Sequence, residues 1–577
     1  MLFFRTGLLV LLTLFTVIAQ GAPLKLKLTG LDKELEENAS LYLNTLPPID
    51  PHQLPGFRQH IKEKISHSLE ALGYYHSVTT LQLSEKNQNT LLVNVDAGTP
   101  VIIRKLQLNL SGDALEDQAF SDFKTNLPLQ EGDILDQGKY EAIKSTLVNL
   151  ALARGYFDAS LTQHTIEIFP KENSAHITLS METGHRYQFG APIYSKMTAP
   201  TQKLLEYLIN FQPDQSYDSV KLGKLTQDIS STGYFQNIDV HPVKEDIDDL
   251  AVPIFIGVKP RLKHELQVGA GYSTDEGPRG FLNWDKPWVN HYGHSLSSEA
   301  MISGKRTEIS SSYKIPAGNP LQDYYSLQLG YQRKYIQDTD SSLLSTSVHR
   351  WTKRSLRKKN SWDQDVFFRV ESESFEQGIQ KDKNLLLIPG VSFSRRRIRG
   401  GADPHWGDQQ LAKLELSSRS WGSDADFIKA WGRTKWLRTY AKKHRVMTRF
   451  EQGAIWMPGD ITDIPPSLRF FAGGDQSIRG YAYESISPRD KDNKLTGARY
   501  MTAASFEYAY SFAPKWRIAT FVDSGTATNN YRDKWKTGTG FGIRWVSPLG
   551  QLKLDLAFAI SEEDTPWRLH FTMGPEL

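Results

Sequence analysis

Apolar and polar residues alternate along many short segments in the carboxyl-terminal half of the chain. In QLKLDLAFAI (551–560) every second residue is a large apolar one, and the opposite face carries Lys553 and Asp555. The segment YSLQLGY (325–331) has the same period of two, which is typical of a strand with two different faces. Charged side chains cannot form the core of a soluble sandwich. The pattern therefore predicts a transmembrane β-barrel with an apolar outer face and a polar lumen.

The alternating pattern begins near residue 264 and continues to the end of the chain. At roughly 20 residues per strand and turn, this length corresponds to about sixteen antiparallel strands. The long polar stretches 353–365 and 486–498 are predicted to be extracellular loops. After residue 22 no apolar run approaches the roughly 18 residues that a membrane-spanning helix needs.

The amino-terminal half contains a repeat. The segments LEALGYYHSVTT, LALARGYFDASLT and DISSTGYFQNIDV share a Gly-Tyr-aromatic core at Gly73, Gly155 and Gly233. In each copy a helical pattern precedes the glycine, which is the residue preferred just after a helix end. Alternating strands follow. We predict three α+β modules of order β-α-α-β-β, each with a three-stranded sheet.

The first residues have the character of a secretory signal. Arg5 precedes an apolar stretch from Leu8 to Ala19, and Ala19 and Gly21 are the small residues expected before a cleavage site. The predicted organisation is a signal peptide (1–21), three modules (22–102, 103–187 and 188–263) and a barrel (264–577).

Composition narrows the function. There is no cysteine, so disulfides and thiolate metal sites are impossible, and a net charge of +3 argues against a dedicated nucleic-acid binder. All 13 tryptophans lie at or after Trp284, as expected for the aromatic girdles of a barrel. Zinc-protease, nucleophile-elbow and P-loop motifs do not occur. We expect no enzymatic activity and no cofactor.

Two charged clusters are candidate binding sites. The run RRRIR (395–399) could bind an anion, but a solvated loop or a lumen wall is the simpler interpretation. Asp403, His405 and Asp408 lie close together in the sequence, yet nothing holds them in a ligand geometry, and we predict no metal site.

The segment FAGGDQSIRGYAY (471–483) places Arg479 in a predicted loop. Its guanidinium stays charged at any accessible pH and needs an acceptor. Glu507 lies on the polar side of a predicted strand. Asp523 shares its strand face with Phe521 and Gly525, where a glycine leaves room for another backbone. Spacing alone does not choose between these two carboxylates, or exclude an exposed loop tip.

The three modules resemble polypeptide-transport-associated (POTRA) domains. IRGY (478–481), followed by FVDSG (521–525) within a carboxyl-terminal barrel, resembles the outer-membrane assembly and secretion superfamily, which includes BamA and the two-partner secretion transporters. Three modules with a barrel of this size most resemble its translocation and assembly module branch. The resemblance implies a sixteen-stranded barrel whose loop folds back into the lumen, where Arg479 bonds Asp523 and Glu507. It also implies that Gly480 permits a tight turn and that Tyr481 packs against the wall.

The same resemblance implies a Gram-negative outer-membrane location with the POTRA domains in the periplasm. The implied clients are outer-membrane proteins of the autotransporter type. The implied partner is a long periplasmic protein anchored in the inner membrane, and outer-membrane lipid surrounds the barrel. Partner or client strands could pair with the edges of the POTRA sheets.

The two ends of the barrel suggest a weak seam. Gly269 and Gly271 weaken the first predicted strand, and Gly574 and Pro575 weaken the last. We hypothesise that this seam opens and pairs with a client strand; ordinary fraying of strand ends is the alternative. Two rival functions remain: a two-partner secretion transporter, which has two modules and a plug helix, and a passive pore.

Overall fold

The computed structural model describes residues 24–84, 87–244, 249–357, 360–401, 403–547 and 550–574. The predicted signal peptide (1–21) and Pro575 lie outside the described residues. Within these ranges, no helix combines the length and the apolar character that crossing a membrane requires. The chain divides into two compact units.

The first α+β domain has a sheet of order β1-β3-β2, in which β1 runs parallel to β3. Asp32 accepts a hydrogen bond from the backbone N–H of Leu35 and so caps the first helix. The core lies between Ile61, Ile65 and Leu69 of the second helix and the sheet. The elements are β1 (Lys25–Thr29), α1 (Lys33–Leu43), η1 (Pro51–Gln53), α2 (Leu54–Glu70), β2 (Val78–Ser84) and β3 (Asn87–Asp96).

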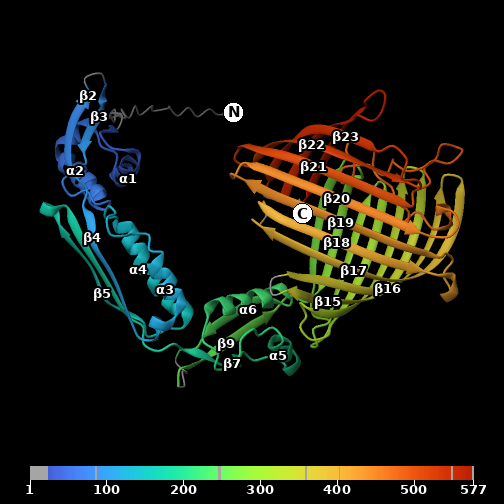
Figure 1. Cartoon of the computed structure of the whole chain (residues 1–577), viewed down its shortest axis with the longest axis horizontal. Helices are drawn as coiled ribbons and strands as arrows, with labels where there is room; N and C mark the ends of the chain where they lie inside the picture. Colours follow the sequence, from blue (N-terminus) through green and yellow to red (C-terminus); the bar gives the residue numbers. More distant parts are fainter. Residues whose placement is uncertain are drawn as a thin grey trace, which may run out of the picture. The chain divides into compact units, whose positions relative to one another are not determined.

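The second domain repeats this order, and its two longer helices lie along one face of the sheet β4-β6-β5 (Figure 1). Ile143, Leu147 and Ala151 form the buried face of α4, as its periodicity predicts, and Gly155 ends the helix with a φ of 90°. The elements are β4 (Ile102–Ser111), η2 (Asp113–Glu116), α3 (Gln118–Thr125), α4 (Gln137–Arg154), β5 (Ser160–Phe169), η3 (Pro170–Glu172) and β6 (Ser174–Glu182).

The third domain has the sheet order β7-β9-β8. The β-α-α-β-β prediction is therefore confirmed for all three domains. Gly73 and Gly233, the equivalents of Gly155, also have a positive φ, of 92° and 73°. The elements are β7 (Gln188–Tyr194), α5 (Ala199–Glu206), α6 (Ser219–Ser231), β8 (Phe235–Pro242) and β9 (Ala251–Pro260).

A buried carboxylate links the helices of the second domain. Asp117 caps α3 through the backbone N–H of Ala119 and receives both Nε (3.0 Å) and Nη2 (2.9 Å) of Arg154. Tyr156 of the Gly-Tyr-aromatic core donates to it as well, at 3.2 Å. Burial raises the pKa of Asp117, but the hydrogen bonds and charge of Arg154 outweigh it, and the net pKa lies below its usual value.

We expect this domain to lose stability in acid through Asp117. A carboxyl group whose pKa is lowered by folding stabilises the fold above its unfolded pKa of about 3.9, and this contribution disappears as the pH falls through the folded value. Asp117→Asn keeps the cap and removes the charge. The urea midpoint of this variant, followed by helical circular dichroism, should be lower at neutral pH and depend less on pH below about pH 5. Glu141→Gln, at an ion pair whose carboxylate is mostly exposed, is the control. An Asp117→Asn profile parallel to wild type would contradict this role.

The carboxyl-terminal half forms one antiparallel sheet of sixteen strands in chain order, curved into a barrel (Figure 1). The strands are β10 (Glu265–Ser273), β11 (Gly277–Lys286), β12 (Ser295–Ser303), β13 (Arg306–Pro316), β14 (Asp323–Ile336), β15 (Thr339–Arg357), β16 (Asn360–Gln377), β17 (Gln380–Arg399), β18 (Trp406–Ser417), β19 (Phe427–Tyr440), β20 (His444–Trp456), β21 (Tyr500–Ala513), β22 (Trp516–Thr528), β23 (Lys536–Ser547), β24 (Gly550–Ala559) and β25 (Trp567–Gly574). The short turns η4 (Arg419–Trp421) and η5 (Ile461–Asp463) lie between strands.

Strand parity predicts correctly which side chains face out. On β14, Leu327 and Leu329 are exposed on the outer face, whereas Ser326 is buried. On β24, Leu554 is exposed and Asp555 is buried on the inner face. The number of strands and the two faces of the barrel are therefore confirmed.

The prediction of an extracellular loop at 353–365 is wrong. This stretch continues β15 and β16 as one long hairpin, in which Lys353 pairs with Asp363 and Arg354 donates to Gln364 at 2.9 Å. Polar cross-strand pairs support a hairpin as well as apolar ones do. Since strands alternate in direction, this hairpin extends from the end of the barrel at which β10 begins.

The loop between β20 and β21 turns inward and brings an apolar core into the lumen, so the interior is less polar than the strand pattern predicts. Stretch 486–498 belongs to this inward loop, with Ile486 and Leu495 buried at its ends, instead of forming a solvated extracellular loop. The core contains Ile461, Ile464, Leu468, Phe470, Ala472, Ile478, Tyr481, Ile486 and Ala498 of the loop and Leu386, Ile388, Ala425, Phe427, Ile455, Met501, Ala527 and Ala559 of the surrounding barrel.

Candidate functional site

The inward loop delivers Arg479 to the barrel wall through a glycine turn. Gly480 has a φ of 96°, a left-handed conformation that favours glycine, and a Cβ there would lie 3.1 Å from the backbone nitrogen of Ala559. Its N–H donates to Nε2 of His570 at 3.0 Å. The turn therefore fixes the backbone directly after the arginine.

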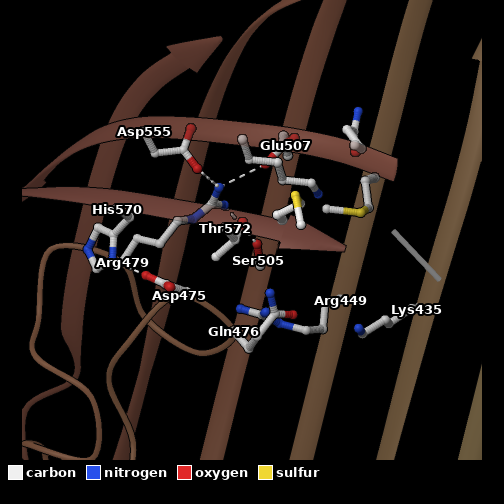
Figure 2. A pocket seen from close by; sticks show the side chains of 14 residues that line it. Lys435, Arg449, Asp475, Gln476, Arg479, Ser505, Glu507, Asp555, His570 and Thr572 are labelled. Atoms are coloured by element: carbon white, nitrogen blue, oxygen red, sulfur yellow. Dashed lines mark hydrogen bonds and ion pairs between the residues drawn. The ribbon is translucent and has the colours of Figure 1, made fainter. Parts of the chain in front are cut away.

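The guanidinium of Arg479 is buried among three carboxylates, two of which are labelled in Figure 2. Nε and Nη2 donate to the two oxygens of Asp523 at 2.7 and 3.0 Å, the bidentate geometry of a strong charge-assisted pair. Nη1 donates to Glu507 at 2.8 Å and to Asp555 at 3.2 Å. The backbone N–H of Arg479 also reaches Asp523, at 3.1 Å. Thus Glu507 and Asp523, the two carboxylates that strand parity placed on the inner face, both contact the arginine.

A second arginine completes the network from the wall. Arg544 on β23 donates Nε and Nη2 to Glu507, at 3.1 and 2.9 Å, and Nη1 to Asp555 at 2.5 Å. Glu507 and Asp555 therefore each join the loop arginine to a strand arginine. Such a network holds a charged loop in the interior because each charge keeps hydrogen-bonding partners after leaving water.

The other predicted residues surround this network. The ring of Phe521 lies under Arg479, with its centroid 3.4 Å from the guanidinium carbon. Tyr481 is buried in the apolar core of the loop. At Gly525 a Cβ would lie 2.1 Å from the carbonyl oxygen of Thr502. The backbone that approaches this glycine closely is therefore that of the neighbouring strand β21. We call Arg479, Gly480, Tyr481, Glu507, Phe521, Asp523 and Gly525 the loop–barrel lock.

Sequence reasoning missed Asp555, Arg544, His570 and Gly538 of this site. Asp555 and Arg544 have the inward parity of their strands, a signal that marks them as inward charges but does not show that they lie at the height of Arg479. Gly538 of β23 gives no signal in the sequence. A Cβ at Gly538 would lie 1.8 Å from the carbonyl oxygen of Arg479, so the loop backbone rests directly on this position.

The seam between β10 and β25 is sparsely bonded. Strands that are neighbours in the sheet are paired along their lengths, as β10 is with β11. β10 and β25 instead stand at the two ends of the strand order. Among the described residues, the backbone contacts across the seam are Thr274 N–H to Phe571 O (3.3 Å) and Phe571 N–H to Thr274 Oγ1 (3.2 Å).

The glycines predicted at the seam lie on its two strands. The ring of Phe281 on β11 covers Gly269, and the side chain of Arg279 covers Gly271. Gly574 is the last residue of β25 and pairs with Gln551 of β24, away from the seam.

The other charged clusters belong to the barrel wall. Arg397 of the RRRIR run donates to Asp408 at 2.7 Å, consistent with a lumen wall. Asp403 instead accepts from Arg445 and Arg517. The acids that were weighed as metal ligands thus serve different arginines.

Comparison with known families agrees with the fold and the site. The Omp85 superfamily domain matches residues 263–576, and the chain belongs to this superfamily. A model described as "POTRA domain TamA domain 1" matches residues 25–97, and the POTRA model "Surface antigen variable number repeat" matches residues 107–184. Superfamily membership together with the lipid-facing barrel indicates an outer-membrane protein with periplasmic POTRA domains.

The chain is similar to proteins named outer membrane protein assembly factor BamA. It is 27% identical to that of Nitratidesulfovibrio vulgaris over 381 residues, which are 62% of this chain and 47% of the relative. It is 19% identical to that of Neisseria meningitidis over 585 residues, 89% of this chain and 72% of the relative. The chain thus spans about half the length of the first relative. The crystal structure of Haemophilus ducreyi BamA lacking POTRA domains 1–3 has a TM-score of 0.64 at 15% identity, covering 82% of this chain and 99% of that one, and it supports the fold.

Proposed function

We propose that this protein is an assembly factor that inserts or secretes other β-rich outer-membrane proteins through the seam between β10 and β25. The observation that carries the proposal is the sparse bonding of this seam in a barrel whose other neighbouring strands are continuously paired. The names of the BamA relatives support assembly as the class of activity.

The seam offers a client a physical route into the membrane. Along β10, the N–H and C=O groups on the side away from β11 form an edge that can pair with an incoming strand. Each residue of client that pairs there exchanges water for a backbone partner before it meets lipid, where an unpaired polar group is costly. Assembly then requires no chemical reaction.

The finer proposal is a translocation and assembly module subunit similar to TamA, with clients of the autotransporter type. The first-domain match and the three POTRA domains support it. Its partner would be a TamB-like periplasmic protein anchored in the inner membrane of a Gram-negative cell. The edge strands β2, β5 and β8 of the three POTRA sheets are the surfaces on which partner or client strands could pair.

Cross-linking the seam tests the proposal. The rings of Tyr272 and Phe571 are neighbours across it, tilted against each other with centroids 6.1 Å apart. We expect a disulfide between cysteines at these positions to abolish client assembly by the full-length protein, because the edge of β10 stays covered. Reduction should restore assembly. The chain has no cysteine of its own, so the engineered pair is the single reactive one.

The matched control places cysteines at Val268 and Leu282, which are register partners inside the sheet. This disulfide should leave assembly unchanged. Normal assembly with the seam fully cross-linked would refute insertion through it.

The apolar core that the loop brings into the lumen argues against the rival function, a passive pore. Conductance in a planar bilayer tests this point, and a large and steady current would favour the pore.

A further inference from the structure

The loop that carries the lock also contacts the seam. Asp475 lies four residues before Arg479. Its carboxylate accepts from Oγ1 of Thr274, at 3.2 and 3.3 Å to its two oxygens, and its backbone N–H donates to Asp275 at 2.9 Å. Thr274 and Asp275 directly follow β10. The same carboxylate is hydrogen-bonded to Nδ1 of His570 on β25, and Figure 2 shows the two side chains beside Arg479. One residue of the loop therefore contacts both sides of the seam.

His570 connects this contact to the lock. Its Nε2 accepts the N–H of Gly480, so in the neutral imidazole the proton is on Nδ1 and donates to Asp475. Both His570 and Asp475 are almost completely buried. A charged acceptor removed from water forms stronger hydrogen bonds than an exposed one.

The contact lies where the seam is held together. Thr274 forms the two backbone contacts with Phe571, and its hydroxyl also donates to Asp475. Because backbone bonding across the seam is sparse, the bridge from Thr274 through Asp475 to His570 is a large part of the polar contact there. Opening the seam must break this bridge on at least one side.

We propose that Asp475 is a latch that holds the seam closed and couples its opening to the position of the inward loop. The proposal deepens the proposed function, since an assembly factor would need its seam closed until a client arrives. The latch itself can be measured without any client.

The test measures the seam directly. Spin labels are attached to cysteines at Val268 on β10 and Leu569 on β25, two exposed outer-face positions, in the full-length protein in lipid bilayers. Electron-electron double resonance gives the distance distribution. We expect Asp475→Ala to raise the ratio of long-distance to short-distance populations roughly ten-fold, the usual effect of losing a hydrogen bond to a charged group. Asp492→Ala changes an exposed aspartate of the same loop and should leave the distribution as in wild type.

A second variant separates the latch from general damage. Thr274→Val removes the hydroxyl that donates to Asp475 and also accepts the N–H of Phe571. Only the part of its effect that passes through Asp475 is shared, so the double variant should open the seam less than the sum of the two single effects predicts. Additive effects, or a wild-type distribution for Asp475→Ala, would overturn the latch. If Asp475→Ala fails to fold, Asp475→Leu, which is close in size and has no acceptor, replaces it, with the same two outcomes.

The latch and the proposed function can fail separately. An unchanged seam in the variants refutes the latch whatever happens to clients. Normal client assembly with a cross-linked seam refutes the proposed route, and the distance measurement remains interpretable.

Discussion

Replacing Arg479 with alanine should release the inward loop from the wall and destabilise the barrel by about 3–5 kcal/mol, the usual cost of breaking a buried ion pair from one side. The substitution leaves Asp523 without its bidentate partner, and Glu507 and Asp555 keep Arg544 as their remaining guanidinium in the network. Asp523 then keeps the hydroxyl of Ser505 as its side-chain hydrogen-bonding partner in the network. We expect client assembly to decrease as well, because the inward loop no longer stays bound to the barrel wall.

The measurement is denaturant unfolding in lipid, followed by tryptophan fluorescence, because all 13 tryptophans lie in the barrel half. Arg479→Lys should rescue only partly, since an ammonium cannot bond two carboxylates through a planar fork. Arg489→Ala is the control, because Arg489 lies in the same loop and is exposed. Wild-type stability and assembly in both Arg479 variants would remove the lock from the mechanism.

Replacing Gly538 with alanine should displace the loop without removing a charge. The new Cβ would lie 1.8 Å from the carbonyl oxygen of Arg479, which is closer than any real contact. Gly538 belongs to the barrel wall, so the loop is the part that must move. Overpacking a tightly filled interior costs about 1–3 kcal/mol or more. We expect a loss in unfolding free energy of this size and faster proteolysis of the loop.

The control for this effect is Gly280→Ala on β11, where a Cβ would meet no atom within 4 Å. Both substitutions add one methyl group to a barrel strand, so a difference between them reports the contact with the loop. Equal stability of the two variants would show that the loop backbone does not rest on Gly538.

Much of the fold could be predicted because local pattern and final environment agree. A strand with one face toward lipid must keep a strict period of two, so Leu554 and Asp555 already indicate outside and inside. A helix that ends in a left-handed residue favours glycine, so Gly155 marks the end of α4. The prediction failed at 353–365, where polar composition suggested a loop although cross-strand pairs continue the hairpin.

The candidate site was predicted less completely. Parity placed Glu507 and Asp523 on the inner face, and family resemblance joined them to Arg479. Asp555 and Arg544 were missed as partners because parity tells which face a side chain takes but not how far along the barrel it lies. That height depends on the stagger of neighbouring strands, which is a property of the whole sheet.

By itself the sequence determined the three α+β domains and the faces of the barrel strands, because these follow from periods of 3.6 and 2 within single segments. The number of strands followed from the length of the alternating region at roughly 20 residues per strand and turn. Only the tertiary structure decided that one buried arginine meets three carboxylates from three strands, and that Asp475 bridges the two ends of the barrel. These contacts join residues up to about 200 positions apart. Their geometry exists only after the sheet has curved and the loop has entered it, so no local pattern records it.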